Sequence, residues 1–197
     1  AAVGDEVYDG SIFPNGFRDG STLYGTVMTE GPTPPDEDRL VLRLPEVLQM
    51  LLDAEGEPRG HGLTQEDVDQ GMGYYSVRPV PDKPIRLITL KTVDSEAIIG
   101  LGHEGYIDTI QFEWLEEELA RADREGEVVV VVSHHGADEL GLTSPTTSDE
   151  LKEALLGCDG MVLHLVGHGH NNTKHLIEDA SGRDGYWELM LASTLDF

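Results

Sequence analysis

Two stretches decide the fold: VVVVVSHH at residues 128–135 and MVLHLVGHGH at residues 161–170. Each begins with an apolar run that has the length and β-branched character of a buried strand, and each ends in histidines. Continuous apolar runs of this kind are typical of strands that are covered on both faces of a sheet. If the two strands are neighbours, their ends meet at one edge of that sheet, and we expect the two histidine groups to lie there together.

The histidines at these strand ends indicate a metal site. Imidazole is the commonest side-chain ligand for zinc, and it also binds manganese and iron. A ligand at the end of a strand is held by the sheet while its ring faces a cleft. Two neighbouring strands that deliver His134, His135, His168 and His170 to one edge could hold a pair of metal ions. The sequence therefore predicts a metal-dependent hydrolase.

Around these two stretches, the chain alternates predicted helices and strands. Further strands are predicted at residues 74–77, 85–93, around 175–177 and at 187–192, and helices at 45–54, from 64, at 112–122 and, capped by Ser148, up to 156. This order predicts an α/β fold in which helices flank a sheet with an antiparallel tail. Residues 1–72 are rich in glycine, proline and aspartate and form an irregular region, whereas residues 73–197 form the regular part of the chain.

The composition restricts the partners of the protein. The formal charge is −25, so nucleic acid phosphates and anionic membranes are repelled, and no apolar run is long enough to span a bilayer. An acidic surface of the halophilic kind explains this charge better than a cationic partner does, and we expect the protein to lose stability at low salt. The single Cys158 cannot form an intrachain disulfide, and we expect it to be a small buried filler.

The order of these motifs resembles the C-terminal half of the calcineurin-like metallophosphoesterases over residues 73–197. That family has a Gly-His-x-His motif, which residues 167–170 match, and an upstream histidine at a strand end, which His134 matches. It also commonly has a Gln-x-x-Trp-Leu helix, matched by Gln111, Trp114 and Leu115. The subgroup that this chain resembles has long insertions between its motifs and often carries a twin-arginine export signal.

The resemblance implies a β-sandwich flanked by helices, in four layers, and a phosphoesterase with two divalent metal ions. By the same resemblance, His134 and His168 bind one ion and His170 the other, with a carboxylate bridging them. His135 either contacts the substrate, which makes it the candidate catalytic residue, or merely finishes its strand. The metals are manganese, iron or zinc, the substrate is a phosphomonoester or phosphodiester, and an extracytoplasmic location is favoured.

The upstream motifs of the family are not matched. No Asp-x-His occurs in the chain, and residues 3–7 are the only candidate for the Gly-Asn-His-Asp/Glu motif. There Asp5 would be a metal ligand, while Glu6 and Val7 replace the expected histidine and acid. We expect a truncated form, incomplete at its N-terminus, for which a partner chain or a homo-oligomer would cover the exposed sheet. The alternative is a degenerate, non-catalytic homologue that binds a metal or a partner.

Other zinc hydrolases also use His-x-His, but their motif comes early in the chain, whereas here it is late and Asn171 and Asn172 follow it. The remaining histidines are interpreted as surface or core residues: His61, His103, His164 and His175. His164 has a second interpretation, since its place on the strand that leads to His168 would let it brace a metal ligand.

Overall fold

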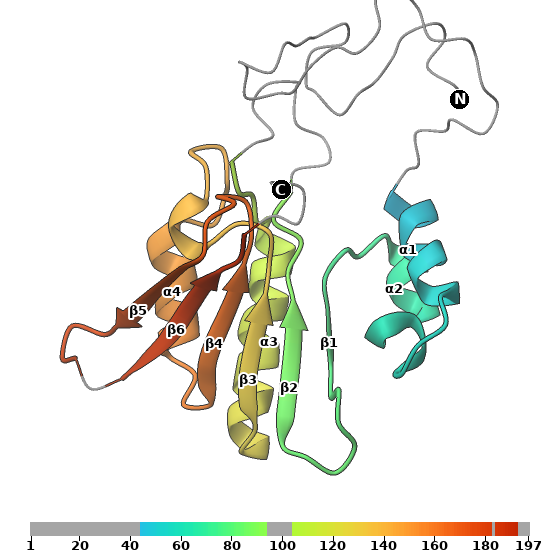
Figure 1. Ribbon diagram of the computed structural model, residues 1–197, viewed down its shortest axis with the longest axis horizontal. Helices are drawn as coiled ribbons and strands as arrows, with labels where there is room; N and C mark the ends of the chain where they lie inside the picture. Colours follow the sequence, from blue (N-terminus) through green and yellow to red (C-terminus); the bar gives the residue numbers. More distant parts are fainter. Residues whose placement is uncertain (1–43, 94–103, 183, 193–197) are drawn as a thin grey trace, which may run out of the picture. The chain divides into compact units, whose positions relative to one another are not determined.

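The computed structural model describes residues 44–93, 104–182 and 184–192 (Figure 1). The helices are α1 (Leu44–Asp53), η1 (Arg59–Gly62), α2 (Gln65–Gln70), α3 (Thr109–Glu125), η2 (Ala137–Glu139) and α4 (Ser148–Leu156). The strands are β1 (Tyr75–Val77), β2 (Ile85–Thr89), β3 (Val128–Val132), β4 (Met161–Val166), β5 (Thr173–Glu178) and β6 (Gly185–Met190). Asp5, His103 and residues 1–43 of the irregular region lie outside the described residues.

The six strands form one sheet in the order β1-β2-β3-β4-β6-β5. Strands β2, β3, β4 and β6 are parallel, while β1 and β5 pair antiparallel at the two edges. The histidine-bearing strands β3 and β4 are therefore parallel neighbours, with Val132 opposite Leu165 at their carboxyl ends. This register brings the two histidine groups to the same edge of the sheet, as predicted.

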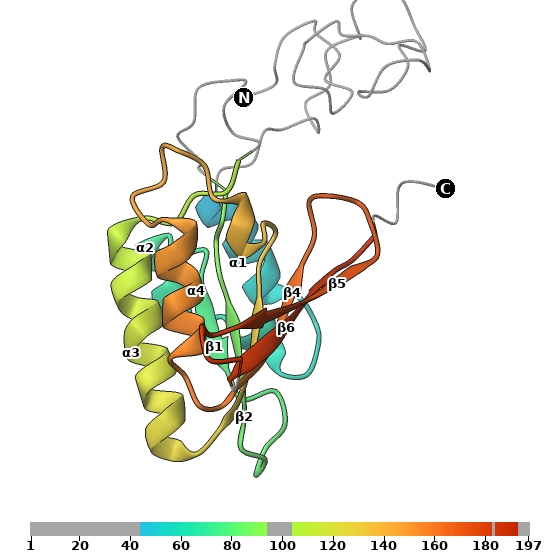
Figure 2. The ribbon, with the colours of Figure 1, turned by 90° about the vertical axis from the view of Figure 1, so that its left-hand side faces the viewer.

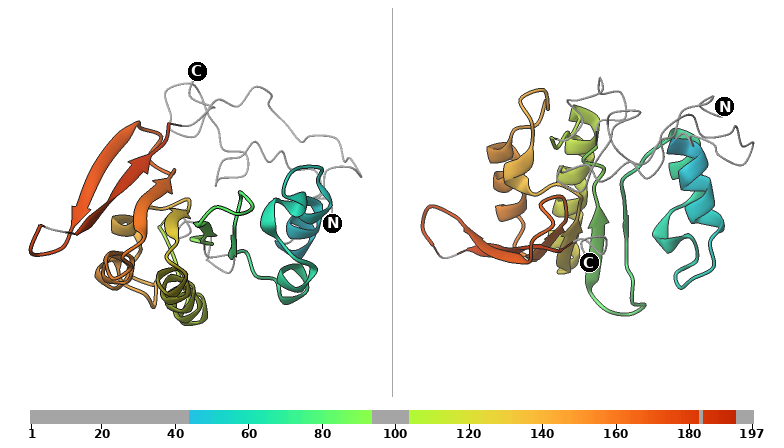
Figure 3. Two further views of the ribbon diagram at one scale, coloured as in Figure 1. Left: turned by 90° about the horizontal axis from the view of Figure 1, so that it is seen from below. Right: turned by 45° about the horizontal axis from the view of Figure 1, so that its top comes forward.

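Helices α3 and α4 lie side by side on one face of the sheet (Figures 2 and 3). The apolar core fills the space between them and the strands, and its fully buried members include Ile88, Leu115, Val131, Leu151 and Leu155. A smaller apolar cluster joins α1, α2 and the segment before α2, and the half-buried Tyr75 of β1 packs against it. Within the described residues, no helix combines the length and apolar character that crossing a bilayer requires.

Local sequence explains where α3 begins and ends. The predicted helix at 112–122 is longer, because Asp108 caps it three residues earlier by accepting a 2.8 Å hydrogen bond from the backbone N–H of Gln111. Gly126 ends α3 in the left-handed conformation, at φ 64°.

The prediction that Ser148 caps α4 is wrong, because the cap is Thr147. The carboxylate of Glu150 accepts from the backbone N–H of Thr147 at 2.8 Å, and the Thr147 hydroxyl accepts from the N–H of Glu150 at 3.2 Å. This reciprocal arrangement needs an acid three residues after the cap, which Thr147 has and Ser148 lacks.

Strand β2 is shorter than the predicted strand at 85–93, because a buried side chain takes over the backbone of Lys91. The amide of Gln111, which is fully buried, donates to the Lys91 carbonyl at 2.9 Å and accepts from the Lys91 N–H at 2.8 Å. Backbone groups held by a side chain are no longer available to a neighbouring strand. Gln111 therefore fixes the path of the chain as it leaves the sheet toward the histidine edge.

Cys158 is a buried thiol, as predicted. Burial and the nearby carboxylate of Asp123, whose Oδ1 lies 3.2 Å from Sγ, raise the pKa of Cys158 to about 11. The prediction of an α/β fold is confirmed, and the described residues contribute one sheet and its flanking helices to it.

Candidate metal centre

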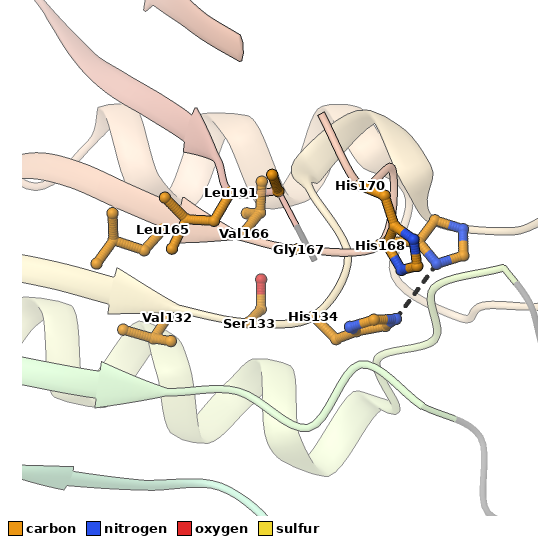
Figure 4. Close-up of a pocket in the computed structure, with 10 residues that line it drawn as sticks. Val132, Ser133, His134, Leu165, Val166, Gly167, His168, His170 and Leu191 are labelled. Carbon is orange, nitrogen blue, oxygen red and sulfur yellow. Dashed lines mark hydrogen bonds between the residues drawn. The ribbon is translucent and has the colours of Figure 1, made fainter. Parts of the chain in front are cut away.

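Three imidazoles converge at the carboxyl ends of β3 and β4. One nitrogen from each of His134, His135 and His168 lies within 4.8 Å of the others. His168 Nδ1 and His134 Nε2 are 3.3 Å apart (Figure 4). Among the described residues, this is the one group of histidine, cysteine or acidic side chains that comes together closely enough to hold a metal ion.

The turn after β4 aims the second pair of histidines by means of unusual backbone conformations. His168 and His170 have φ values of 66° and 54°, in the left-handed region that costs an ordinary residue about 1 kcal/mol or more. The glycines beside them leave room, because a Cβ at Gly169 would lie 2.5 Å from Met190 Sδ. Backbone strain of this kind concentrates at functional sites.

A cavity of about 430 Å³ lies in front of these strand ends. Figure 4 shows His134, His168 and His170 at one end of it, with His170 beyond His168 along the turn. The lining residues are Val132, Ser133, His134, Leu165, Val166, Gly167, His168, His170, Leu191 and Ala192. The cavity therefore combines an imidazole end with apolar walls, and none of its lining side chains is a lysine or an arginine.

The electrostatics favour an uncharged His134. Although the side chain is exposed at one edge, desolvation, followed by the nearby His168 and His170, lowers the pKa of His134 below its ordinary value. A metal ion binds only the neutral form of imidazole, so a lowered pKa prepares the ring for coordination near neutral pH.

His135 is the buried member of the group, with only 1% of its surface exposed. The Thr92 hydroxyl accepts from the backbone N–H of His135 at 3.0 Å and lies 3.1 Å from its Nδ1. Because Gln111 fixes the preceding Lys91, Thr92 is itself held in place. His135 is thus the histidine of the group that is most tightly oriented by its neighbours.

The structure brings together some of the site residues that the sequence predicts. His134 and His168 come together, and His170 lines the same cavity but is not part of the tight three-nitrogen group. Asp5 lies outside the described residues. Sequence reasoning gave no role to Thr92, Ser133 or Glu188. Ser133 directly precedes His134, whereas Thr92 reaches the histidine edge from the segment after β2 and Glu188 reaches it from β6.

The remaining histidines among the described residues behave as surface or core residues. His61 and His175 are exposed, and His164 is fully buried. His164 does not face the cavity, because it pairs with Val131 on the helix-covered face of the sheet. It nevertheless approaches the histidine edge from below, through a 2.8 Å contact between its Nε2 and Ser133 Oγ.

Comparison with known proteins identifies the fold. No family model and no curated protein sequence matches the chain. Among solved structures, the chain is similar to a dimetal phosphatase from Danio rerio, with a TM-score of 0.51 and 15% identity over 74% of this chain. The chain covers 56% of that phosphatase, so it spans about half of its length. The α/β fold therefore matches a metallophosphoesterase-like fold.

A second similarity is to the sulfate thiohydrolase SoxB of Thermus thermophilus, solved in complex with glycerol. It has 17% identity and covers 68% of this chain and 26% of that enzyme. Its TM-score of 0.33 is too low to support a conclusion about this chain.

Proposed function

We propose that this chain belongs to a metal-dependent phosphoesterase that hydrolyses a phosphomonoester or phosphodiester at a site with two divalent metal ions. The observation that supports this function best is the convergence of His134, His135 and His168 within 4.8 Å at the carboxyl ends of two parallel strands. In the proposal, His134 and His168 bind one ion, and His170 binds the other. Asp5, outside the described residues, is a candidate ligand for an ion.

The donor set fits such metal ions. Neutral imidazoles bind manganese, iron and zinc, and the lowered pKa of His134 favours its neutral form. Bound ions would neutralise charge on the phosphate oxygens and activate the attacking water. The positive charge for an anionic substrate has to come from such ions, because the cavity is lined by no cationic side chain and the chain carries a net charge of −25.

The residues of the chain would hold and orient the substrate. The apolar walls formed by Val132, Leu165 and Leu191 offer a surface for the organic part of the ester. In the proposal, His135 is the candidate catalytic residue, and Thr92 holds it at two atoms. It is buried and does not line the cavity, so a contact with the phosphoryl group would need a local rearrangement.

A degenerate, non-catalytic homologue is the alternative, and one observation favours it. Within the described part of the chain, the metal-binding group contains three imidazoles and no carboxylate. Two-metal sites commonly need a bridging carboxylate, so these residues alone suit a single ion or a binding role.

The test is a metal count combined with turnover. Elemental analysis of the purified protein should find about two metal ions per chain, and p-nitrophenyl phosphate or its diester should be hydrolysed with added Mn²⁺. His168→Ala should lose metal and activity, whereas His175→Ala on the exposed strand β5 should keep both. One metal ion with no turnover would support the degenerate homologue, and unchanged metal content in His168→Ala would contradict the site.

Two further expectations are part of this proposal. The resemblance to an often exported subgroup leads us to propose an extracytoplasmic location, which fractionation of producing cells would test. A partner chain or a second copy would cover exposed apolar side chains such as Leu176 and Trp187, which are 44% and 45% exposed. Light scattering of the purified protein would detect the second copy.

A further inference from the structure

A chain of buried polar groups runs beneath the metal centre, across three neighbouring strands. Ser133 follows β3, His164 lies in β4 and Glu188 lies in β6, and their exposed fractions are 9%, 0% and 7%. His164 Nε2 is 2.8 Å from Ser133 Oγ, and His164 Nδ1 is 3.1 Å from Glu188 Oε2. The histidine and the glutamate are cross-strand partners in the parallel pair β4 and β6.

The donor and the acceptor of each hydrogen bond at Ser133 can be assigned. The Ser133 hydroxyl donates to the backbone carbonyl of His135 at 2.6 Å. Its single hydrogen is thereby used, so His164 Nε2–H must donate to Oγ. The side chain of Ser133 thus joins His164 to the backbone of the residue next to the ligand His134.

The glutamate holds the other end of the same loop. Glu188 Oε2 accepts a 3.0 Å hydrogen bond from the backbone N–H of Ala137. Burial by itself raises the pKa of Glu188, but the contacts with His164 and with Ala137 N–H outweigh it, and the net pKa lies below the ordinary value. The carboxylate is therefore ionised. Its Oε2 also lies 3.1 Å from His164 Nδ1, a contact that is favourable only when Nδ1 carries a proton as well as Nε2.

Glycine at position 136 allows this close approach. A Cβ there would lie 3.0 Å from Glu188 Oε1, which is tighter than an ordinary contact. The segment Ser133–Ala137, which carries His134 and His135, is consequently held at both ends by groups from β4 and β6. Burying polar groups costs free energy unless they are paired. If these three residues only filled space, apolar side chains would do so at a lower cost in free energy.

We propose that Ser133, His164 and Glu188 form a positioning relay that sets the orientation of His134 and His135 and thereby the metal affinity of the site. The inference rests on the proposed metal-binding function. None of the three residues coordinates the metal in this scheme, and the relay acts through the backbone of the ligand segment. Groups that orient ligands in this way typically alter metal affinity by about 10- to 100-fold when they are removed.

The same three side chains could instead act as a nucleophile, a base and an acid. The geometry favours positioning, because Ser133 is almost fully buried and its hydrogen points at the His135 carbonyl rather than at His164. A nucleophilic serine needs its proton on the histidine side and an accessible oxygen.

The test is metal affinity in matched variants, measured by titration with Mn²⁺ and by the visible spectrum of the Co²⁺ form. Ser133→Ala and Glu188→Gln should each weaken binding about 10- to 100-fold and alter the Co²⁺ spectrum. Ser133→Thr, which keeps the hydroxyl, should restore most of the affinity. Glu127→Gln is the control, because Glu127 is equally buried but pairs with Arg86 at the other end of the sheet, and its loss should lower Tm without changing affinity.

A readout without metal separates this inference from the proposed function. In the metal-free wild type, the long-range ¹H–¹⁵N spectrum should show His164 protonated at Nε2, and the Ala137 amide should exchange slowly. Glu188→Gln should accelerate that exchange, while Glu127→Gln should not. A wild type that binds no metal but shows these signals would contradict the proposed function and leave the relay standing as a device that orders the loop.

Two results would overturn the relay. One is wild-type metal affinity in Ser133→Ala and Glu188→Gln, together with an unchanged Co²⁺ spectrum. The other is stoichiometric labelling of Ser133 by a fluorophosphonate probe, which would make the serine a nucleophile.

Discussion

The two ends of the sheet hold polar groups of opposite character. At the amino end, Arg86 pairs with Glu118 at 2.7 Å and with Glu127 at 2.6 Å, and all three are at least 94% buried. At the carboxyl end, His134 and His168 face each other at 3.3 Å, and both are at least partly exposed. In the first group a guanidinium lies between two carboxylates, whereas the second presents nitrogen atoms to one another.

This difference separates a structural cluster from a binding site. A buried arginine between carboxylates satisfies its donors within the protein, and no external ion is required. Imidazole nitrogens that converge with no carboxylate in the group are a donor set that a metal ion can bind. The amino end should therefore control stability, and the carboxyl end should control binding.

The largest expected effect is at the amino end, in Arg86→Met. The substitution removes the buried cation between Glu118 and Glu127, which keep only the half-exposed Arg121 and Arg78 as partners. Breaking a buried pair costs about 3–5 kcal/mol when no cation remains, so we expect a loss toward the lower end of that range, about 3 kcal/mol. Urea unfolding followed by circular dichroism measures this loss. Metal affinity, measured on the folded fraction, should stay at the wild-type value. An Arg86→Met protein with wild-type stability would show that the buried cluster is not structural.

A second prediction concerns Gly160, which directly precedes β4. A Cβ at Gly160 would lie 1.9 Å from the backbone carbonyl oxygen of Glu127, and a backbone atom cannot move aside as a flexible side chain can. Gly160→Ala should therefore cost about 1–3 kcal/mol. At the carboxyl end, the equivalent conflict at Gly169 is with the flexible Met190, so Gly169→Ala should lose less stability but weaken metal binding. Equal losses of stability in the two variants would contradict the contrast between the ends.

A third, smaller effect should appear on acidification. Burial alone raises the pKa of Glu127, but its bonds to Arg86 and Arg78 outweigh burial, so the folded-state pKa lies below the ordinary 4.5. A lowered folded-state pKa means that this stabilisation is fully present above the unfolded pKa, near 4.5, and is lost as pH falls through the folded value. The free energy of unfolding should decrease below about pH 4.5. In Arg86→Met the decrease should be shallower, because part of the interaction that lowers the pKa is gone.

Much of the sheet and half of the site could be predicted from sequence. The apolar runs at 128–132 and 161–166 predict β3 and β4 because buried strands need such runs, and the histidines directly after them predict the convergence. The fold that the family resemblance implied is matched by the phosphatase of similar structure.

The contacts that reach the histidine edge from distant parts of the chain could not be predicted, because they depend on the strand order and on the path of the loops. Glu188 reaches His164 because β6 inserts between β4 and β5, and nothing in the local sequence fixes that order. Thr92 reaches His135 across 43 residues of sequence, through a segment whose path is set by a buried glutamine. The face on which His164 lies was also not predictable from its spacing to His168, because the strand ends at Val166 and its alternation does not continue into the left-handed turn.

The smallest effect, and the one that separates binding from stability most sharply, is at His168 itself. Its φ of 66° favours glycine, and a side chain with a Cβ costs about 1 kcal/mol there. His168→Gly should therefore be more stable than His168→Ala by about that amount, while both variants lose metal affinity to the same extent. Thermal unfolding without metal measures the first difference, and Mn²⁺ titration measures the second. Equal stability of the two variants would mean that the turn relaxes once the imidazole is gone. In that case the imidazole of residue 168, and not the glycine-flanked backbone, would hold the left-handed conformation that orients the candidate metal ligands.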